Sequence, residues 1–430
     1  MNLDALRQSL PPRLLRIAEE IHTANGRAFL VGGWVRDAWL GRESRDYDIE
    51  VYGLQQDELL RILRRFGRPN LVGKSYGVIL LDIQGYPCDF SFPRLESKTG
   101  TGHRAFAVEA RPDLDFHTAA LRRDFTINAM GMELPEMTLV DPHGGLRDLE
   151  DHRLRHVSAA FAEDPLRVLR AVQFAARFDL QLEPETVELC RSLDLRELSR
   201  ERLYEEFRKW LLQALHPSRG LEVFQQLELQ RFFPWLQTPQ GGIDLWGACL
   251  DRAVQTHEGS PVEQMALMLA LLACGADSKE SVLAFLESLT QETALLKQVP
   301  ALWSEGPQLL SALEDGRSLQ APWLRRLALR VALPQACAWV RAWVPPEQQN
   351  LLQSLDQTVA FAHDLDVWEQ APIPLLTGKI LLDMGMRPGR LFGEWIAESF
   401  ELQLDGQIIN AEQARTWAER KSLEILHFNR

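Results

Sequence analysis

The chain has 430 residues, 46% of them apolar, and a net charge of −13 at neutral pH. This length allows two or three domains, and because there is no apolar run of roughly 18 residues we expect no membrane span. The acidic balance argues only weakly against nucleic-acid binding, which depends on local basic patches. The five cysteines form no CxxC pair and the N-terminal residues lack a signal-peptide layout, so we expect a cytoplasmic protein without a cysteine zinc site.

The first predicted elements are a helix over residues 13–24 and a strand–turn–helix–strand unit over residues 29–51. Both are indicated by the spacing of their apolar residues. The turn is formed by Gly32 and Gly33, which lack a Cβ and so permit a close approach of the backbone to a ligand. Arg36 lies in the first turn of the short helix that follows, where free N–H groups favour an anion.

Asp46 and Asp48 open the second strand of this unit. On a strand, residues i and i+2 point to the same side, so their carboxylates repel each other unless a cation lies between them. Oxygen ligands of this kind suit Mg²⁺, which takes one or two carboxylates together with substrate phosphates. Taken singly, the two glycines and the two aspartates are also compatible with ordinary turns and caps.

A small mixed sheet is predicted to continue after this unit. Its parts are a helix over residues 56–66, strands over 76–83 and 88–92, and a turn over 85–87. Asp89 lies on the last of these strands. Residues 95–121 show little periodicity, and Gly100 and Gly102 indicate a loop.

The segment from residue 122 to residue 177 is rich in arginine, and helical spacing begins at about residue 161 and continues to the end of the chain. The basic residues are Arg122, Arg123, Arg147, Arg153, Arg155, Arg167, Arg170 and Arg177. Glu163 and Asp164 lie at the start of a predicted helix in which Pro165 is tolerated at the first turn. His143, His152 and His156 are expected to be structural or to contact phosphate, because no ligand spacing supports a zinc site.

Five segments together carry a family resemblance. They are LVGGWVRDAWLGR at 30–42, DYDIEV at 46–51, RRDFTINAM at 122–130, DPHGGLRDL at 141–149 and EDPLRVLRAVQFAARF at 163–178. The chain resembles the nucleotidyltransferase superfamily that includes DNA polymerase beta, and within it the class II CCA-adding tRNA nucleotidyltransferases and bacterial poly(A) polymerases. The resemblance is dense from residue 29 to residue 178 and faint afterwards.

The resemblance implies an α+β head with a polymerase-beta-like fold, followed by an all-α neck, body and tail. We expect the head over residues 1–140, a helical neck with the base-binding helix over 141–215, and a tRNA-binding body and tail over 216–430. Lys379, Arg387 and Arg390 are expected tRNA phosphate contacts, although solvated charges on a helical bundle would look the same.

The resemblance also implies the roles of the site residues. Catalysis would fall to Asp46, Asp48 and Asp89, with Asp46 and Asp48 holding Mg²⁺, and Asp89 has the alternative of being a surface strand residue. Nucleotide binding would fall to Gly32, Gly33, Arg36, Arg123, Asn128, Asp164, Arg167 and Arg170, with Arg202 supporting the base-binding residues. Arg122 and Arg123 are also compatible with a surface basic pair, and Asp124 with an arginine-orienting role.

Base choice is expected to depend on Asp164 and Arg167, which we expect at positions i and i+3 of one helix, with neighbouring side chains. Cytosine and adenine each offer an amino donor beside a ring-nitrogen acceptor, whereas uracil and guanine offer a carbonyl and an N–H. A carboxylate beside a guanidinium complements the first pair. The alternative is an exposed intrahelical salt bridge, worth about 0.3–0.5 kcal/mol.

The expected function is template-independent addition of CMP and AMP to the 3′ end of tRNA, with CTP and ATP as substrates and pyrophosphate as product. An A-only adding enzyme and a poly(A) polymerase share every motif quoted above. A CC-only enzyme is disfavoured by the loop near Gly100, a small-molecule nucleotidyltransferase by the long helical body, and an inactive RNA-binding protein by the intact Asp46 and Asp48. Where some relatives carry a His-Asp phosphohydrolase pair this chain has residues 272–277, LACGAD, so we expect no such activity.

Overall fold

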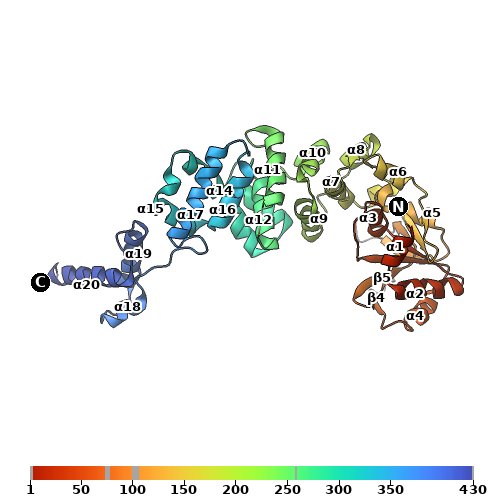
Figure 1. Cartoon of the computed structure of the whole chain (residues 1–430), viewed down its shortest axis with the longest axis horizontal. Coiled ribbons are helices and arrows are strands. Elements are labelled where there is room, and N and C mark those ends of the chain that lie inside the picture. The colour runs from red at the N-terminus through yellow and green to blue at the C-terminus, as the bar shows by residue number, and fades with distance from the viewer. Residues whose placement is uncertain (1–2, 73–77, 99–105, 257–258, 429–430) are drawn as a thin grey trace. The chain divides into compact units, whose positions relative to one another are not determined.

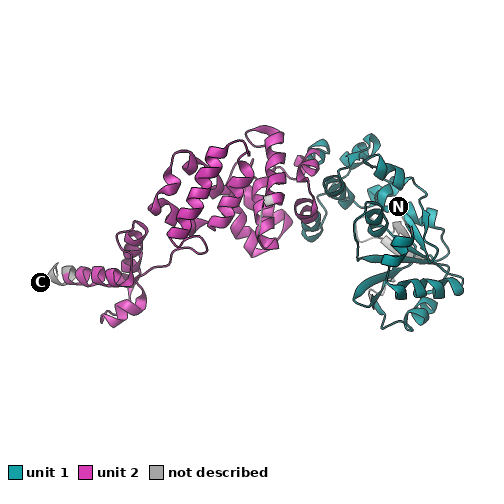
Figure 2. Ribbon diagram, viewed as in Figure 1, with its two compact units in different colours: residues 1–206, 223–228 teal, residues 207–222, 229–430 magenta. Residues whose placement is uncertain are grey.

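A computed structural model of the chain describes residues 3–72, 78–98, 106–256 and 259–428. These residues form two compact units, coloured separately in Figure 2. Unit 1 comprises residues 1–206 and 223–228, and unit 2 comprises residues 207–222 and 229–430. The expected three-part division into head, neck, and body with tail stays a prediction about function.

Unit 1 is built around one mixed sheet of seven strands, in the order β3-β4-β5-β2-β1-β8-β9. Strands β4 and β5 of this sheet are labelled in Figure 1. The strands are β1 Arg27–Val31, β2 Tyr47–Tyr52, β3 Asn70–Val72, β4 Val78–Ile83, β5 Tyr86–Ser91, β8 Gly131–Leu134 and β9 Thr138–Val140. β2 and β5 are parallel, whereas the other neighbours are antiparallel. The predicted small mixed sheet is thus confirmed.

Both faces of the sheet are covered, and strand alternation decides which side chain enters which core. On β1, Ala28 and Leu30 join the larger core with α2 and α4, while Phe29 and Val31 join a smaller core on the other face. Phe29 stacks there on Phe116 of α5, with 4.8 Å between ring centroids. The helices of unit 1 therefore fix the sheet from both sides.

The helices of unit 1 begin mostly at polar caps or prolines. They are α1 Leu3–Ser9, α2 Pro12–Thr23, α3 Gly33–Trp39, α4 Gln56–Leu63, α5 Phe116–Ala120, α6 Gly145–Glu150, α7 Leu166–Phe178, α8 Pro184–Arg191 and the first part of α9 Arg200–Gln213. Gln55 and Glu58 form a capping box at α4. Asp115 accepts the backbone N–H of Thr118 at 2.7 Å and so begins α5.

The prediction of little regular structure over residues 95–121 is wrong. β6 Arg94–Lys98 and β7 Phe106–Ala110 pair as an antiparallel ladder, and α5 follows. The sequence of β6, RLESK, is polar and that of β7, FAVEA, is short, so strand alternation is hard to recognise in either. The predicted loop glycines Gly100 and Gly102 lie outside the described residues. The turn predicted at residues 85–87 is one residue earlier, because Gln84 and Gly85 adopt positive φ and Tyr86 already belongs to β5.

Unit 2 is helical, as predicted. Its longer helices are α10 Pro217–Gln226 in part, α11 Gly242–Thr256, α12 Pro261–Leu272, α13 Lys279–Leu289, α14 Thr293–Glu314, α15 Ala321–Arg330, α16 Leu333–Trp343 and α17 Gln349–Asp364. The last three are α18 Gly378–Asp383, α19 Arg390–Leu404 and α20 Ala411–Phe428, which share a small core around Leu381 and Trp395.

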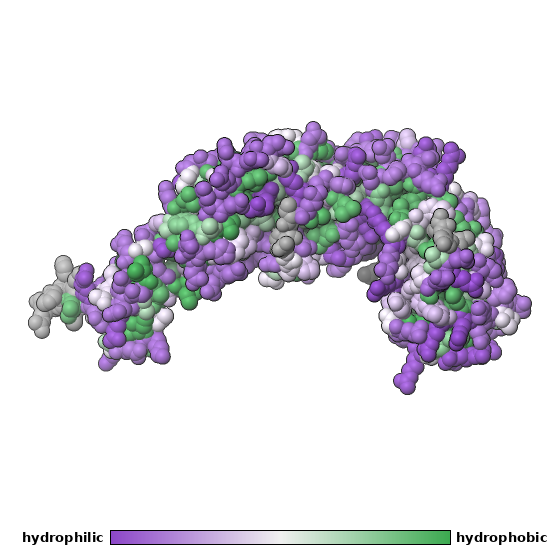
Figure 3. Space-filling view, in the orientation of Figure 1, coloured by the Kyte–Doolittle hydropathy of each residue, from purple (hydrophilic) through white to green (hydrophobic). Residues whose placement is uncertain are grey.

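The surface of the last three helices mixes polar and apolar side chains. Leu382, Leu391 and Ile409 are exposed there by 51%, 48% and 66%, and hydrophobic residues are visible on that part of the molecule in Figure 3. Lys379, Arg387 and Arg390 are exposed on the same segment, and Arg390 pairs with Glu394. Among the described helices, none combines the length and apolar character needed to cross a bilayer.

Candidate active site

The diglycine turn joins β1 to α3 in unit 1. Gly32 adopts φ +67°, a conformation that residues with a Cβ rarely take. A Cβ built on Gly32 would lie 3.6 Å from Nη1 of Arg123, and one built on Gly33 would lie 3.4 Å from Nη2 of Arg36. Two guanidinium groups therefore flank the turn, which gives it the charge that a phosphate requires.

The three predicted acidic residues lie along two neighbouring parallel strands. Asp48 of β2 and Asp89 of β5 are register partners, so their side chains stand next to each other on one face of the sheet. Asp46 lies just before β2, one residue outside that strand, and is close enough for its charge to raise the pKa of both Asp48 and Asp89. Asp46 and Asp48 are exposed and Asp89 is half-buried. The structure thus brings together the carboxylates that the resemblance assigned to one site, although Asp89 lies on a different strand from Asp48.

The carboxylates interact unfavourably with one another. Although solvent reaches the Asp48 side chain, the surrounding protein removes part of its hydration, and this together with Asp46 and Asp89 raises the pKa of Asp48 to about 6. Burial and the charge of Asp46 also raise the pKa of Asp89. Within the described ranges, no side chain forms an ion pair with Asp46, Asp48 or Asp89.

This donor set fits a hard divalent cation. Carboxylate oxygens that repel each other and lack a cationic partner are what Mg²⁺ prefers, and it usually completes its shell with water and substrate phosphates. No group of three or more possible ligands in the described part of the chain is close enough to hold an ion alone. The pair Asp46 and Asp48 would therefore hold a metal together with substrate, and Asp89 lies beside them.

Asp48→Asn is expected to stabilise the protein at pH 7. The pKa of Asp48 is higher in the folded state than in the unfolded chain, so stability is full below about pH 4 and is lost as pH rises through about 6. After allowance for solvent screening the gain is about 1 kcal/mol, or roughly 2–4 °C in Tm. Thermal unfolding at pH 7 and pH 4, without divalent ions, checks this.

The expected difference disappears at pH 4, where Asp48 is protonated in wild type. Added Mg²⁺ is expected to raise the Tm of wild type more than that of the variant. An equal Tm for the two proteins at pH 7 would contradict the electrostatic cause.

Arg36 and Asn128, both predicted to bind nucleotide, form a buried pair. Arg36 is 5% exposed and its Nη1 donates to Oδ1 of Asn128 at 2.6 Å, while its Nε and Nη2 donate to Asp37. Its guanidinium also lies 4.2 Å from the ring centroid of Phe178. Arg36 therefore holds the start of α3 in place, and its predicted nucleotide contact would involve only the edge that faces Gly33.

Asp124 links Asn128 to Arg170. It accepts Nδ2 of Asn128 at 3.1 Å, Nε of Arg170 at 2.7 Å and the backbone N–H of Phe125 at 2.8 Å. Burial opposes the charged form, but Arg170 and these hydrogen bonds outweigh burial and lower the pKa of Asp124. The arginine-orienting role expected for Asp124 is observed, and Arg170 is committed to this ion pair.

Arg123 is held beside strand β2 by an ion pair with Glu50. Its Nη2 is 3.3 Å from Oε2 of Glu50, which also accepts the hydroxyl of Tyr52 at 2.6 Å. Glu50 is two residues after Asp48 and therefore on the same face of β2. The sequence analysis missed Glu50, although the i+2 spacing that paired Asp46 with Asp48 continues to it.

The assumption that Asp164 and Arg167 lie on one helix is wrong. Asp164 has extended dihedral angles and precedes α7, which begins at Leu166. Its Oδ2 accepts Nη2 of Arg202 at 2.7 Å, so the predicted support by Arg202 is observed as a direct ion pair. Arg167 instead donates to the backbone carbonyls of Ala160 and Arg122. The local cause is Pro165, which ends the extended segment and starts the helix.

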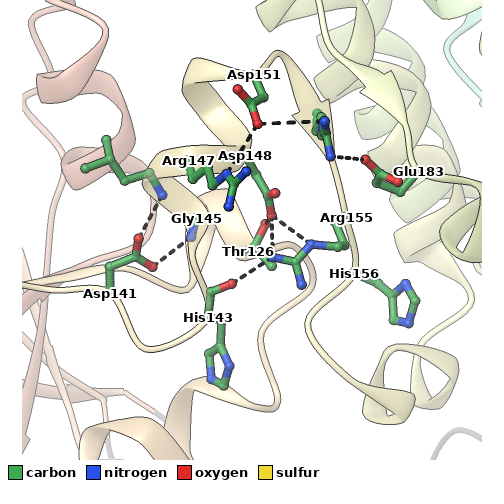
Figure 4. A network of polar contacts seen from close by, with 12 residues as sticks. Thr126, Asp141, His143, Gly145, Arg147, Asp148, Asp151, Arg155, His156 and Glu183 are labelled. Atoms are coloured by element: carbon green, nitrogen blue, oxygen red, sulfur yellow. Dashed lines mark hydrogen bonds and ion pairs between the residues drawn. The ribbon is translucent and has the colours of Figure 1, made fainter.

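A second polar network positions the segment 122–130 (Figure 4). Asp141 accepts the backbone N–H groups of Gly145 and Leu146 at 2.8 and 2.9 Å and so caps α6. Asp148 of α6 accepts the hydroxyl of Thr126 at 2.6 Å and Nε of Arg155 at 3.0 Å. The predicted glycine turn at 144–145 is confirmed, with Gly144 left-handed.

The closeness of this contact explains the second glycine of that turn. A Cβ on Gly145 would lie 2.0 Å from the carbonyl oxygen of Thr126, so only glycine lets α6 reach this segment. Thr126, Asp148 and Arg155 were not predicted as positioning residues. Their partners are separated in sequence by up to 29 residues, from Thr126 to Arg155, and no local pattern reveals them.

Asp148→Ala is expected to destabilise unit 1 by about 2–3 kcal/mol, because it leaves the Thr126 hydroxyl and the Arg155 guanidinium without their acceptor. Asp148→Asn keeps an acceptor for the Thr126 hydroxyl but loses the ion pair, so it should lose less stability than Asp148→Ala. Urea unfolding of the three proteins at one pH measures the difference. Equal midpoints for wild type and Asp148→Ala would show that the network is not stabilising.

A mixed sheet with carboxylates on adjacent parallel strands, facing a diglycine turn between arginines, defines a nucleotidyltransferase head. Comparison with known proteins agrees, because residues 28–155 match the poly A polymerase head domain family. The multifunctional CCA protein of Stenotrophomonas maltophilia is 32% identical over 377 residues, which cover 85% of this chain and 83% of that protein. The chain therefore belongs to the family of multifunctional CCA proteins.

Other matches cover less of the relative or are more distant in sequence. The chain spans 61% of the multifunctional CCA protein of Aromatoleum aromaticum, at 37% identity over 57% of this chain. It spans 50% of that of Azoarcus sp., at 41% identity over 49% of this chain. The fold also matches the Thermotoga maritima CCA-adding enzyme complexed with tRNA, with TM-score 0.67 and 21% identity over 98% of both chains.

Proposed function

We propose that this protein adds CMP and AMP to the 3′ end of tRNA without a template. The observation that carries the proposal is the register of β2 and β5, which sets Asp48 beside Asp89 with Asp46 two residues away. Membership of the multifunctional CCA protein family supports the same conclusion. In the reaction the 3′-hydroxyl oxygen attacks the α-phosphorus of CTP or ATP, a phosphodiester bond forms, and pyrophosphate leaves.

The carboxylates would serve the attacking oxygen and the metal. Asp46 and Asp48 would hold Mg²⁺, which when bound stabilises charge on the attacking and leaving oxygens. Asp89 would orient the 3′-hydroxyl group and help to remove its proton. A carboxylate with a raised pKa accepts a proton more readily than an ordinary one, which suits Asp89 to this work.

The diglycine turn would bind the triphosphate. Gly32 and Gly33 allow the phosphates to approach the backbone, and Arg123 supplies positive charge held in place by Glu50. Asn128 and Arg170 would position this side of the site rather than contact the nucleotide, since both side chains already donate hydrogen bonds to Asp124. The Nη2 group of Arg36 beside Gly33, which also donates to Asp37, would be the part of that side chain that meets the ligand.

Recognition of tRNA would extend to unit 2. The exposed Lys379, Arg387 and Arg390 are the proposed phosphate contacts of the last helices. A cytoplasmic location is proposed from the tRNA substrate. An A-only enzyme and a poly(A) polymerase remain the alternatives, because they share the same head.

The test is product length. A tRNA transcript that lacks the CCA end is incubated with CTP alone, with ATP alone and with both, in Mg²⁺. We expect two additions with CTP and three with both nucleotides. A long tail with ATP alone would identify a poly(A) polymerase. One addition, made only on tRNA that already ends in CC, would identify an A-only enzyme.

A further inference from the structure

Two arginines outside the proposed triphosphate site converge on one aromatic ring of unit 1. Arg42 lies just after α3 and Arg177 lies in the last turn of α7. Their guanidinium carbons lie 5.0 and 5.1 Å from the ring centroid of Phe178, respectively. The guanidinium of Arg42 also donates to the backbone carbonyl of Arg177, at 3.3 and 3.4 Å. The Phe178 ring orients both guanidinium groups, and the carbonyl of Arg177 also holds that of Arg42.

Positive charge at this point is not balanced by carboxylates. Arg36 lies on the same ring at 4.2 Å and is paired with Asp37. For Arg42 and Arg177, no carboxylate of the described residues is within ion-pair distance, and the side chain of Arg177 is bonded only to Gln173 at 3.1 Å. Burial, followed by the neighbouring charges of Arg36 and Arg42, lowers the pKa of Arg177.

Two guanidinium groups held close together on an aromatic ring repel each other, and an anion bound between them offsets this repulsion. Arg42 is exposed and Arg177 is half-buried, so the pair is open to a ligand on at least one side. Guanidinium groups bind phosphate through paired hydrogen bonds, and a fixed orientation reduces the entropy lost on binding. We propose that Arg42 and Arg177 bind a backbone phosphate of the RNA strand that carries the attacking 3′-hydroxyl.

The position of Arg42 along the chain favours the RNA strand over the nucleotide as the source of the bound phosphate. Arg42 comes four residues before Asp46, so their Cα atoms are at most about 14 Å apart. A strand whose 3′ end lies at Asp46 has phosphates within that distance. The nucleotide triphosphate already has the diglycine turn and Arg123. The inference rests on the proposed function for the identity of the strand, and on unit 1 alone for the anion site.

The test measures RNA binding without catalysis. Arg42→Ala, Arg177→Ala and the double variant are titrated with fluorescent tRNA lacking the CCA end, at several salt concentrations and without nucleotide. We expect each single variant to bind about tenfold more weakly near 0.1 M salt and to reduce the slope of log K against log salt by about one. The KM for CTP should stay within about twofold of wild type.

Matched variants separate charge from folding. Arg61→Ala removes an exposed arginine of α4 whose Nε bonds only its own helix, at the carbonyl of Asp57, and should leave affinity and slope unchanged. Arg42→Gln keeps a donor for the Arg177 carbonyl without the charge, so it should fold and still lose the slope. Arg42→Lys should keep the slope.

An unchanged slope in Arg42→Gln and Arg177→Ala would overturn the proposal. A raised KM for CTP with unchanged RNA affinity would overturn it too, because the anion would then belong to the nucleotide. Failure of the proposed function would look different, since wild type would bind the RNA and extend none of it.

Discussion

Replacing Asp46 or Asp48 by alanine should abolish nucleotide addition while unit 1 stays folded. Each variant removes a proposed ligand of the metal, which would stabilise charge at the reacting phosphate and contribute several kcal/mol. We therefore expect kcat to fall by about a thousandfold or more. Single-turnover extension of tRNA with saturating CTP measures this without interference from product release.

Folding can be separated from chemistry at this site. Because the carboxylates repel each other, Asp48→Ala should leave Tm at pH 7 unchanged or raise it. Asp57→Ala, an exposed aspartate in the first turn of α4, is the control and should keep full activity. Residual activity above roughly 1% in Asp46→Ala or Asp48→Ala, at saturating Mg²⁺, would contradict the metal-ligand assignment.

The second large effect concerns base choice at Asp164. Its Oδ2 is held by Arg202 at 2.7 Å and its Oδ1 lies 3.2 Å from the backbone N–H of Leu166, so the carboxylate has a defined orientation. An oriented acceptor meets the amino groups of cytosine and adenine and opposes the carbonyls of uracil and guanine. We expect Asp164→Ala to lower CTP and ATP incorporation strongly and to shrink their preference over UTP and GTP.

Single-nucleotide incorporation into one tRNA, with each of the four nucleotides, gives the ratio of kcat/KM values directly. Glu163→Ala is the matched control, because Glu163 is the adjacent carboxylate and pairs with Arg122. Arg202→Ala should reproduce part of the Asp164 effect by freeing the carboxylate. Unchanged ratios of C and A over U and G in Asp164→Ala would reduce the residue to a surface ion pair, worth at most about 1 kcal/mol.

Local patterns predicted the elements that carry the site. The spacing of apolar residues located α2, β1, β2 and β4, and the diglycine turn falls where the motif places it. Strands β8 and β9 were missed because they are short, with four and three residues, and flank a turn at Pro135. Their alternation is too brief to be distinguished from a loop.

Contacts between distant segments could not be predicted from local sequence patterns, although the family resemblance had grouped some of these residues. The pairing of Asp48 with Asp89 depends on the parallel alignment of strands that are not consecutive. The ion pair of Asp164 and Arg202 joins residues 38 positions apart, and local reasoning instead suggested Arg167. Periodicity gives the face on which a side chain lies but not its partner on another element.

The parallel pairing of β2 and β5 also ties catalysis to stability. Cys88 and Phe90, on either side of Asp89, belong to the large core, as do Tyr47 and Ile49 around Asp48. A slip of β5 by one residue would turn Asp89 into that core and expose its two apolar neighbours. A strand slip that misaligns the carboxylates would therefore also destabilise the fold of the head. Mutations that preserve the core preserve the alignment of the acidic residues without selection acting on activity itself.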